Sequence, residues 1–255
     1  MVNSEYTHKE LESFVRGFRR VSDTVKMEKP DYIFAPVVGA VPFIDILAIV
    51  DRHFPLDSVE YLPNSSRFAN RDELMGRWYA NFYERNEIGD PMKIVCLDEV
   101  LSGSSAVKGY KQFRRSIEDR ARARAEGLSD GSSAVRQYQK KLENDVNYKI
   151  IGVQEAGHKT CVAFNRLVKK GVVHPVNFDK VFTIDNVYLN AIRLRPGEMK
   201  ANGRMSYLPE IERFDVTSDY MELLRNIARC AGVDPSTVNP VNFSKIEQGL
   251  RQSTK

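Results

Sequence analysis

The sequence predicts an α/β protein with a mostly parallel central sheet of about five strands flanked by helices. Three observations predict this fold class. Short and almost continuously apolar segments recur along the chain, as in strands that are buried on both faces. Longer segments with helical periodicity alternate with them, and most connections are long enough for a crossover helix. Ligands of such sheets bind beyond the carboxyl ends of the strands.

The first elements are a helix, a strand and a second helix. Thr7 and Glu10 have the spacing of a capping box, and apolar residues at helical spacing follow, so we expect a helix over residues 8–26. The apolar run YIFAPVV predicts a buried strand that ends at Gly39. Pro42 suits the first turn of a helix that extends to about residue 53.

The rest of the predicted sheet follows with longer connections. A loop rich in Asn, Ser and Arg precedes a helix expected over residues 72–87, whose aromatic cluster we interpret as a packing face. A long helical stretch follows the third strand. The five strands are expected at residues 32–38, 58–62, 92–97, 148–154 and 180–185.

The pattern also predicts the organisation of the chain. Residues 1–190 are expected to form the α/β domain. Residues 107–147 are longer than a crossover needs, which indicates an inserted helical hairpin broken near residues 127–131. Residues 191–255 are expected to be a partly helical C-terminal extension.

A Ser/Gly turn follows the third strand and two acidic residues. Glycine lets successive backbone amides point at one centre, and a helix start adds partial positive charge, so this turn predicts a phosphate site. Asp98 and Glu99 come just before it, about one sugar away, where they can bond ribose hydroxyls or face a magnesium ion. The residues of the turn are Ser102, Gly103, Ser104 and Ser105.

The segment IVCLDEVLSGSSAVKGY resembles the ribose-phosphate signature of type I phosphoribosyltransferases. The earlier segment APVVGAVPFIDILA is similar to the turn with which that family contacts pyrophosphate, and it places Val38, Gly39 and Ala40 there. The resemblance covers residues 31–110 well, the strands up to residue 190 loosely and the last sixty residues hardly at all.

The resemblance implies a phosphoribosyltransferase that binds phosphoribosyl pyrophosphate or a related ribose 5-phosphate. It would transfer the phosphoribosyl group to an unknown acceptor and release pyrophosphate with the help of Mg²⁺. It implies that Asp98 and Glu99 are the catalytic acids, with Asp98 facing the metal indirectly. It also implies a mobile loop over residues 64–90 that closes with one of its arginines: Arg67, Arg71, Arg77 or Arg85.

The sequence departs from the family at several positions, which leaves a second hypothesis open. Aligned on the turn, the two family acids fall on Leu97 and Asp98; aligned on the acids, the loop is one residue short. Leu101 stands where some members carry a catalytic Asp, and Ala40 replaces a glycine. The alternative is a catalytically inactive binding or regulatory module that contacts protein or nucleic acid through its basic hairpin. Another phosphate-binding α/β enzyme is the third reading.

Composition sets the remaining expectations. The net charge of +4 over 255 residues fits an anionic small-molecule ligand as well as it fits weak attraction to nucleic acid. Nucleic acid is not favoured, because no aromatic platform accompanies the charge. Three widely spaced cysteines indicate neither disulfides nor zinc, and no secretory signal or membrane segment is apparent, so we expect a cytoplasmic protein. A homo-oligomer or a protein partner remains open. Divergent members of the family also act as effectors in bacterial defence, a setting compatible with this chain.

Overall fold

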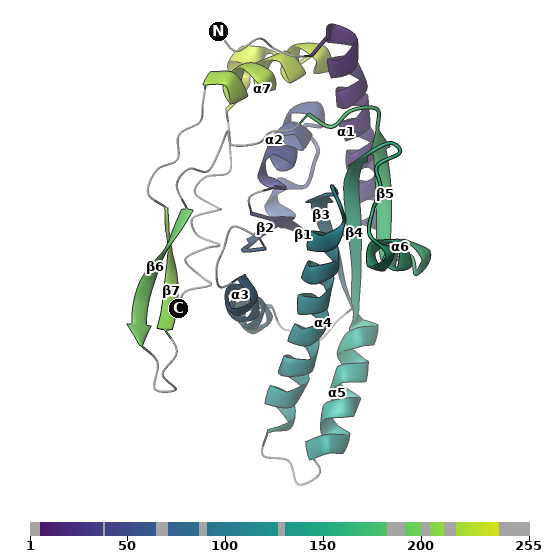
Figure 1. The fold of residues 1–255 in the computed structure, drawn as a ribbon. Coiled ribbons are helices and arrows are strands. Elements are labelled where there is room, and N and C mark those ends of the chain that lie inside the picture. The colour runs from purple at the N-terminus through teal and green to yellow at the C-terminus, as the bar shows by residue number, and fades with distance from the viewer. Residues whose placement is uncertain are drawn as a thin grey trace.

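The computed structural model describes residues 6–37, 39–64, 71–86, 91–126, 131–182, 192–199, 205–211 and 218–239 (Figure 1). Five strands form one sheet in which all neighbours are parallel, in the order β2-β1-β3-β4-β5. Two further strands, β6 and β7, pair antiparallel in a separate small sheet. The strands are β1 (Tyr32–Pro36), β2 (Val59–Leu62), β3 (Met92–Glu99), β4 (Val146–Glu155), β5 (Val173–Phe178), β6 (Ile192–Met199) and β7 (Met205–Ile211).

Helices cover both faces of the five-stranded sheet. α1, α2 and α7 pack on one face, whereas α3, α4, α5 and α6 contribute to a separate apolar cluster on the other. Two short 3₁₀ turns, η1 (Leu56–Ser58) and η2 (Pro235–Thr237), complete the described elements. The helices are α1 (His8–Glu28), α2 (Val41–Val50), α3 (Arg71–Arg85), α4 (Ser104–Ala125), α5 (Gly131–Asp145), α6 (Val162–Lys169) and α7 (Ser218–Ala231).

The alternation of side chains along β3 decides which layer each residue of the site faces. Val95 and Leu97 pack in the cluster with α1 and α2, while Ile94 and Cys96 pack in the cluster with α3 and α4. Because successive side chains of a strand point to opposite faces, Asp98 lies on the α4 side and the next residue on the α2 side.

Most of the predicted elements are confirmed. The sheet is parallel with five strands, and four of them overlap the expected segments. The capping box of α1 is present, since the Thr7 hydroxyl accepts from the Glu10 N–H at 3.2 Å and the Glu10 carboxylate accepts from the Thr7 N–H at 2.7 Å. The aromatic cluster of α3 is a packing face, as expected: Trp78, Tyr79 and Phe82 are at most 1% exposed.

The strand expected at residues 180–185 is wrong. The fifth strand is β5, which lies earlier in the chain, and residues 180–182 are not in a strand; residues 183–185 lie outside the described part. Pro175 interrupts the apolar pattern of β5, because proline cannot donate to a ladder and marks a segment as unsuitable for a central strand. β5 is the outermost strand beside β4, and an edge strand tolerates proline.

The insertion and the C-terminal segment are both built onto this framework. α4 and α5 run in opposite directions as a helical hairpin that extends beyond the sheet (Figure 1). Where the hairpin meets the sheet, the ring of Phe113 stacks on that of Tyr148 with centroids 4.1 Å apart. The helix of the C-terminal segment, α7, joins the main core through Tyr220, Leu224 and Ile227.

Candidate functional site

The strand order of the sheet reverses between β1 and β3, because β2 lies on one side of β1 and the later strands lie on the other. From β1 the chain passes through α2 to β2 at one edge, and from β3 it passes through α4 and α5 to β4 on the other side. α2 and α4 therefore leave the sheet toward opposite faces. In a doubly wound sheet, the crevice at such a switch point binds ligands. Both turns that the sequence predicts as phosphate sites begin here, at the carboxyl ends of two adjacent strands.

The turn before α4 requires glycine for two reasons. Gly103 has φ +75°, in the left-handed region, and a Cβ atom at this position would lie 2.5 Å from the Phe164 ring of α6. The Gly103 carbonyl accepts the Val107 N–H at 3.1 Å, which closes the first turn of α4. Ser104 and Ser105 begin the helix and are exposed. The first amides of a helix have no acceptor within it, so this turn can offer donors to an anion.

The hydroxyl of Ser102 forms hydrogen bonds inside the turn. It accepts the Ser104 N–H at 3.3 Å and lies 3.0 Å from the Ser104 hydroxyl. The Ser102 carbonyl accepts the Cys161 N–H at 2.9 Å, which fastens the turn to the start of α6. The hydroxyls and the helix start are thus held together at the surface.

Asp98 is the buried acid of the site. It is 6% exposed and lies directly before the turn on the side of α4. Burial raises the pKa of Asp98 to about 7 and the charge of Glu99 adds to the shift, while a hydrogen bond from the Glu99 backbone lowers it. Near neutral pH its carboxyl group is therefore close to the balance between the protonated and ionised forms, and it can donate or accept a hydrogen bond.

The turn before α2 is less complete as a phosphate site. Val38 lies outside the described residues. Gly39 is exposed, and an added Cβ would meet no atom of the described residues within 4 Å apart from its neighbours in the chain, so packing against them does not explain the glycine. Ala40 is fully buried, and its N–H donates to the Pro36 carbonyl at 3.0 Å. The Ala40 amide is therefore engaged within the turn, and an anion bound here would depend on Gly39.

The predicted mobile loop over residues 64–90 is wrong for the stretch that forms α3. The aromatic face of this helix is buried against the sheet, which holds the helix in place. Its arginines form ion pairs along the helix or with β2: Arg71 with Asp72 at 3.3 Å, Arg77 with Glu73 at 2.7 Å and Arg85 with Glu60 at 3.6 Å. Arg67 lies outside the described residues.

The acids at the end of β3 set the limits for a bound metal. No group of three or more metal-ligating side chains occurs in the part of the chain that the structure describes. Asp98 and Glu99 face opposite sides of the strand, so they do not form a joint pair of ligands. Mg²⁺ that is bound by substrate phosphates needs only one or two carboxylates from the protein, and this donor set fits that mode.

The structure adds residues that the sequence analysis missed. Asn64 follows β2 at the same end of the sheet and is 7% exposed; its Oδ1 has no hydrogen-bond partner among the described residues. Its Nδ2 lies 2.7 Å from the place of an added Cβ on Gly109, so α4 approaches it closely. An Asn two residues after the end of a predicted strand was the only signal in the sequence. Phe164 was missed because α6 itself was not predicted.

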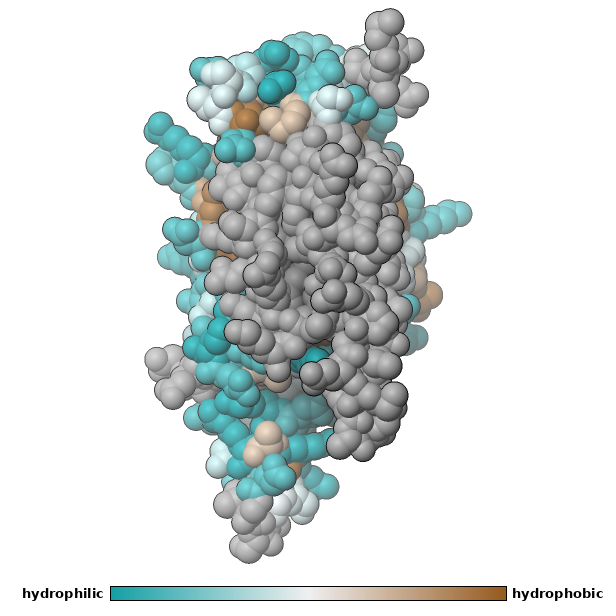
Figure 2. Space-filling view, turned by 90° about the vertical axis from the view of Figure 1, so that its left-hand side faces the viewer, coloured by the Kyte–Doolittle hydropathy of each residue, from teal (hydrophilic) through white to brown (hydrophobic). Residues whose placement is uncertain are grey.

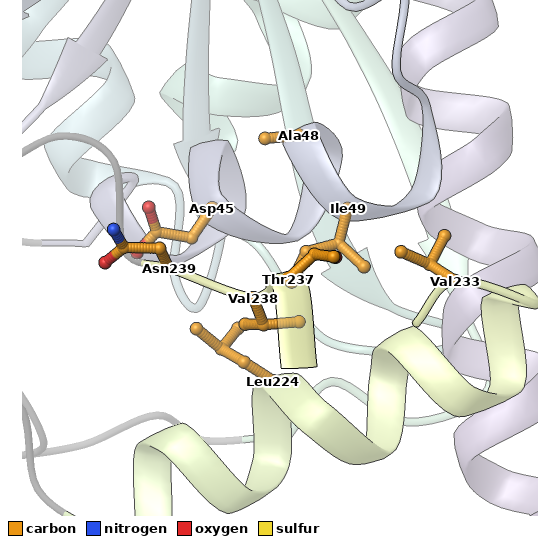
Figure 3. A pocket seen from close by; sticks show the side chains of 8 residues that line it. All are labelled: Asp45, Ala48, Ile49, Leu224, Val233, Thr237, Val238 and Asn239. Atoms are coloured by element: carbon orange, nitrogen blue, oxygen red, sulfur yellow. The ribbon is translucent and has the colours of Figure 1, made fainter. Parts of the chain in front are cut away.

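A separate pocket of about 120 Å³ lies between α2, α7 and η2 (Figure 3). Asp45 and Asn239 lie near each other at one end of it, and apolar side chains such as Ile49 and Val233 line the rest. The Tyr220 hydroxyl donates to Asp45 at 2.5 Å, which ties α7 to α2. No residue of the two predicted phosphate turns lines this pocket.

Comparisons with known proteins do not indicate a function for the chain, so a proposed function rests on the geometry of the site and on the family resemblance of its sequence. No model of a protein family matches the chain, and a comparison with curated proteins also gives no match. Within the described ranges, no helix has both the length and the apolar character that crossing a membrane requires.

Proposed function

We propose that the chain binds phosphoribosyl pyrophosphate or a related ribose 5-phosphate at the carboxyl ends of β1 and β3, as a type I phosphoribosyltransferase does. In the reaction, the bond between the ribose anomeric carbon and the pyrophosphate oxygen breaks, and pyrophosphate leaves with the electron pair. The acceptor forms the new bond to that carbon and loses its proton. The acceptor itself is unidentified.

One observation carries the proposal. The two turns that resemble the family signatures are far apart in sequence, yet both lie at the switch point of the sheet, and the strand before one of them carries a buried acid near its end. A helix cap alone would explain the serines before α4. It would not explain the carboxylic acid kept almost out of water four residues before Ser102. Burying a carboxylate destabilises the fold, and such groups are concentrated at functional sites.

Each part of the site has a role in the proposed reaction. The amides and hydroxyls of the turn at Ser102–Ser105 fix the 5′-phosphate, and Asp98 accepts hydrogen bonds from the ribose hydroxyls. The turn at Gly39 faces the pyrophosphate. Mg²⁺, bound mainly by the substrate with a carboxylate of β3, would neutralise charge on the leaving group. No covalent protein nucleophile is required.

Calorimetric titration with phosphoribosyl pyrophosphate, with and without Mg²⁺, tests the binding step. Ser104→Ala is expected to weaken binding by about tenfold, because removing a hydrogen bond to a charged group costs about 1.5 kcal/mol. Ser133→Ala provides the matched control, since this serine is also exposed near a helix start but belongs to α5. No binding at millimolar ligand, or equal loss in both variants, would contradict the proposed site.

The second candidate function is a binding module without turnover. The engaged amide of Ala40 and the ion-paired arginines of α3 favour it, because both remove groups that would stabilise a leaving pyrophosphate. Assay of the titrated mixture for released pyrophosphate separates the two candidates. Binding with release supports the transferase, and binding that persists without release, across a panel of acceptors, supports the module.

A further inference from the structure

The hairpin formed by α4 and α5 carries the excess positive charge of the chain. Residues 104–145 contain ten Lys and Arg against six Asp and Glu, an excess of four that equals the net charge of all 255 residues. The hairpin extends beyond the sheet (Figure 1), and the lower end of the molecule, where it projects, is mostly hydrophilic in Figure 2. A charge excess confined to a projecting element makes a local field that the net charge understates.

Four of these cations form a row on one face of α4, which we call the basic row: Lys108, Lys111, Arg115 and Arg122. Lys111 and Arg115 are three and four residues from the cation before, and Arg122 is seven residues further on, with the acid Glu118 between Arg115 and Arg122 on the same face. All four cations are exposed. Residues at these spacings share one helix face. Ser104, four residues before Lys108, lies on the same face. The row therefore leads from the phosphate turn outward over about 27 Å of helix.

The charges of the basic row are available to a partner. Arg115 and Asp119 lie 4.0 Å apart, but both are largely exposed, and such a pair contributes little. Lys108, Lys111 and Arg122 form no ion pair with any residue that the structure describes. A polyanion could therefore bind along the row without breaking strong internal contacts.

The surface around the row indicates the kind of partner. The large hydrophobic side chains that are exposed in the described part of the chain are Met27, Leu101 and Val162, and none lies on the hairpin. The apolar face of α4 is buried, with Phe113 and Ile117 in the core. A protein interface would need an apolar or aromatic centre, and a membrane-bound helix would need an apolar face free for lipid.

We propose that the basic row binds the phosphate backbone of a nucleic acid. A linear series of cations without apolar contacts matches recognition through phosphates, which is independent of sequence and strongly dependent on salt. This interaction goes beyond the proposed ribose 5-phosphate site and does not require Asp98.

Fluorescence anisotropy of the full chain with a labelled single strand of about 20 nucleotides, and with the corresponding duplex, tests this inference. We expect a dissociation constant in the micromolar range at about 0.1 M salt, and an affinity that falls as salt rises. The triple variant Lys108→Gln, Lys111→Gln, Arg122→Gln should lose at least tenfold in affinity. It should also reduce the salt slope for the single strand by about two, because each lost phosphate contact removes about 0.7.

A matched variant separates a local row from general charge. Lys9→Gln, Arg16→Gln, Arg225→Gln removes the same charge from exposed positions on α1 and α7 and should change affinity less than twofold. Asp98→Asn should leave nucleic-acid binding unchanged even where it abolishes binding of the ribose phosphate, so the two proposals can fail separately. Far-UV circular dichroism checks that each variant is folded. If the triple variant is not folded, the single variant Lys111→Gln replaces it, and its affinity should fall about threefold.

Three results would overturn the inference. The first is no binding of either nucleic acid at protein concentrations up to about 100 μM, the upper end of ordinary non-specific binding. The second is an equal loss of affinity in the two triple variants. The third is displacement of the oligonucleotide by polyglutamate of the same charge at equal concentration, which would indicate an acidic protein partner instead.

Discussion

Replacing Asp98 with Asn should stabilise the free protein at alkaline pH. The carboxyl group has an ordinary pKa of 3.8, which burial and the charge of Glu99 raise to about 7 in the folded protein. Between these values the folded state holds a proton that the unfolded state has released. The free energy of unfolding therefore falls as pH rises from about 4 through about 7. A shift of about 3 units corresponds to about 4 kcal/mol, and an Asn side chain, which does not ionise, lacks this loss.

Urea unfolding near pH 4 and near pH 8.5 measures the effect. Trp78 is the single tryptophan of the chain and is 1% exposed, so its fluorescence reports the loss of the core. The difference in unfolding free energy, variant minus wild type, should increase by about 4 kcal/mol from the lower to the higher pH. An unpaired amide in the variant could destabilise it by about 1–3 kcal/mol, but this amount is the same at both pH values and cancels.

An exposed aspartate provides the control for this measurement. Asp219→Asn, at the first turn of α7, should leave the pH dependence of stability unchanged. If Asp98→Asn changes the difference between the two pH values by less than about 1 kcal/mol, burial does not penalise the carboxylate and the reasoning fails. If the full effect is found, Asp98 destabilises the apo protein, as expected for an acid that serves a ligand.

Three further substitutions test the framework of the site. Gly103→Ala should destabilise the protein by about 2 kcal/mol or more in urea unfolding and weaken the binding of ribose phosphate, because the positive φ and the Phe164 ring both oppose a Cβ atom. Unchanged stability would show that the turn adapts to the added atom. Tyr220→Phe should lower the unfolding free energy by about 1–3 kcal/mol because it leaves the buried Asp45 without this donor. A loss under about 0.5 kcal/mol would mean that this hydrogen bond contributes little to holding α7 on α2. Burial raises the pKa of Asp51, but hydrogen bonds to its carboxylate outweigh this effect and lower the pKa to about 2. Asp51→Asn should therefore remove about 2 kcal/mol of stability at pH 7 and less below pH 3.8, where protonation removes the same stabilisation from the wild type. Parallel profiles of stability against pH for the two proteins in acid would contradict this reasoning.

The sequence alone determined the parts of the fold that depend on local patterns. The capping box at Thr7 and Glu10, the buried strand at residues 92–97 and the Ser/Gly turn before α4 each carry their signal within a few residues. Alternation of strands and helices was enough to predict a parallel sheet, because a parallel pair needs a crossover between its strands. The turn that we predict to bind phosphate, and the acid before it, were therefore visible before any tertiary information.

Only the tertiary structure decided how these pieces act together. The strand order places the two turns on adjacent strands at the switch point, a long-range relation that no local pattern encodes. Burial within the sheet is what raises the pKa of Asp98. The helix and its aromatic packing face were expected from the sequence, but only the structure shows that this face is buried against the sheet, where the family resemblance implied a mobile loop. β5 escaped prediction because its position at the sheet edge, which makes Pro175 acceptable, is itself a consequence of the complete fold.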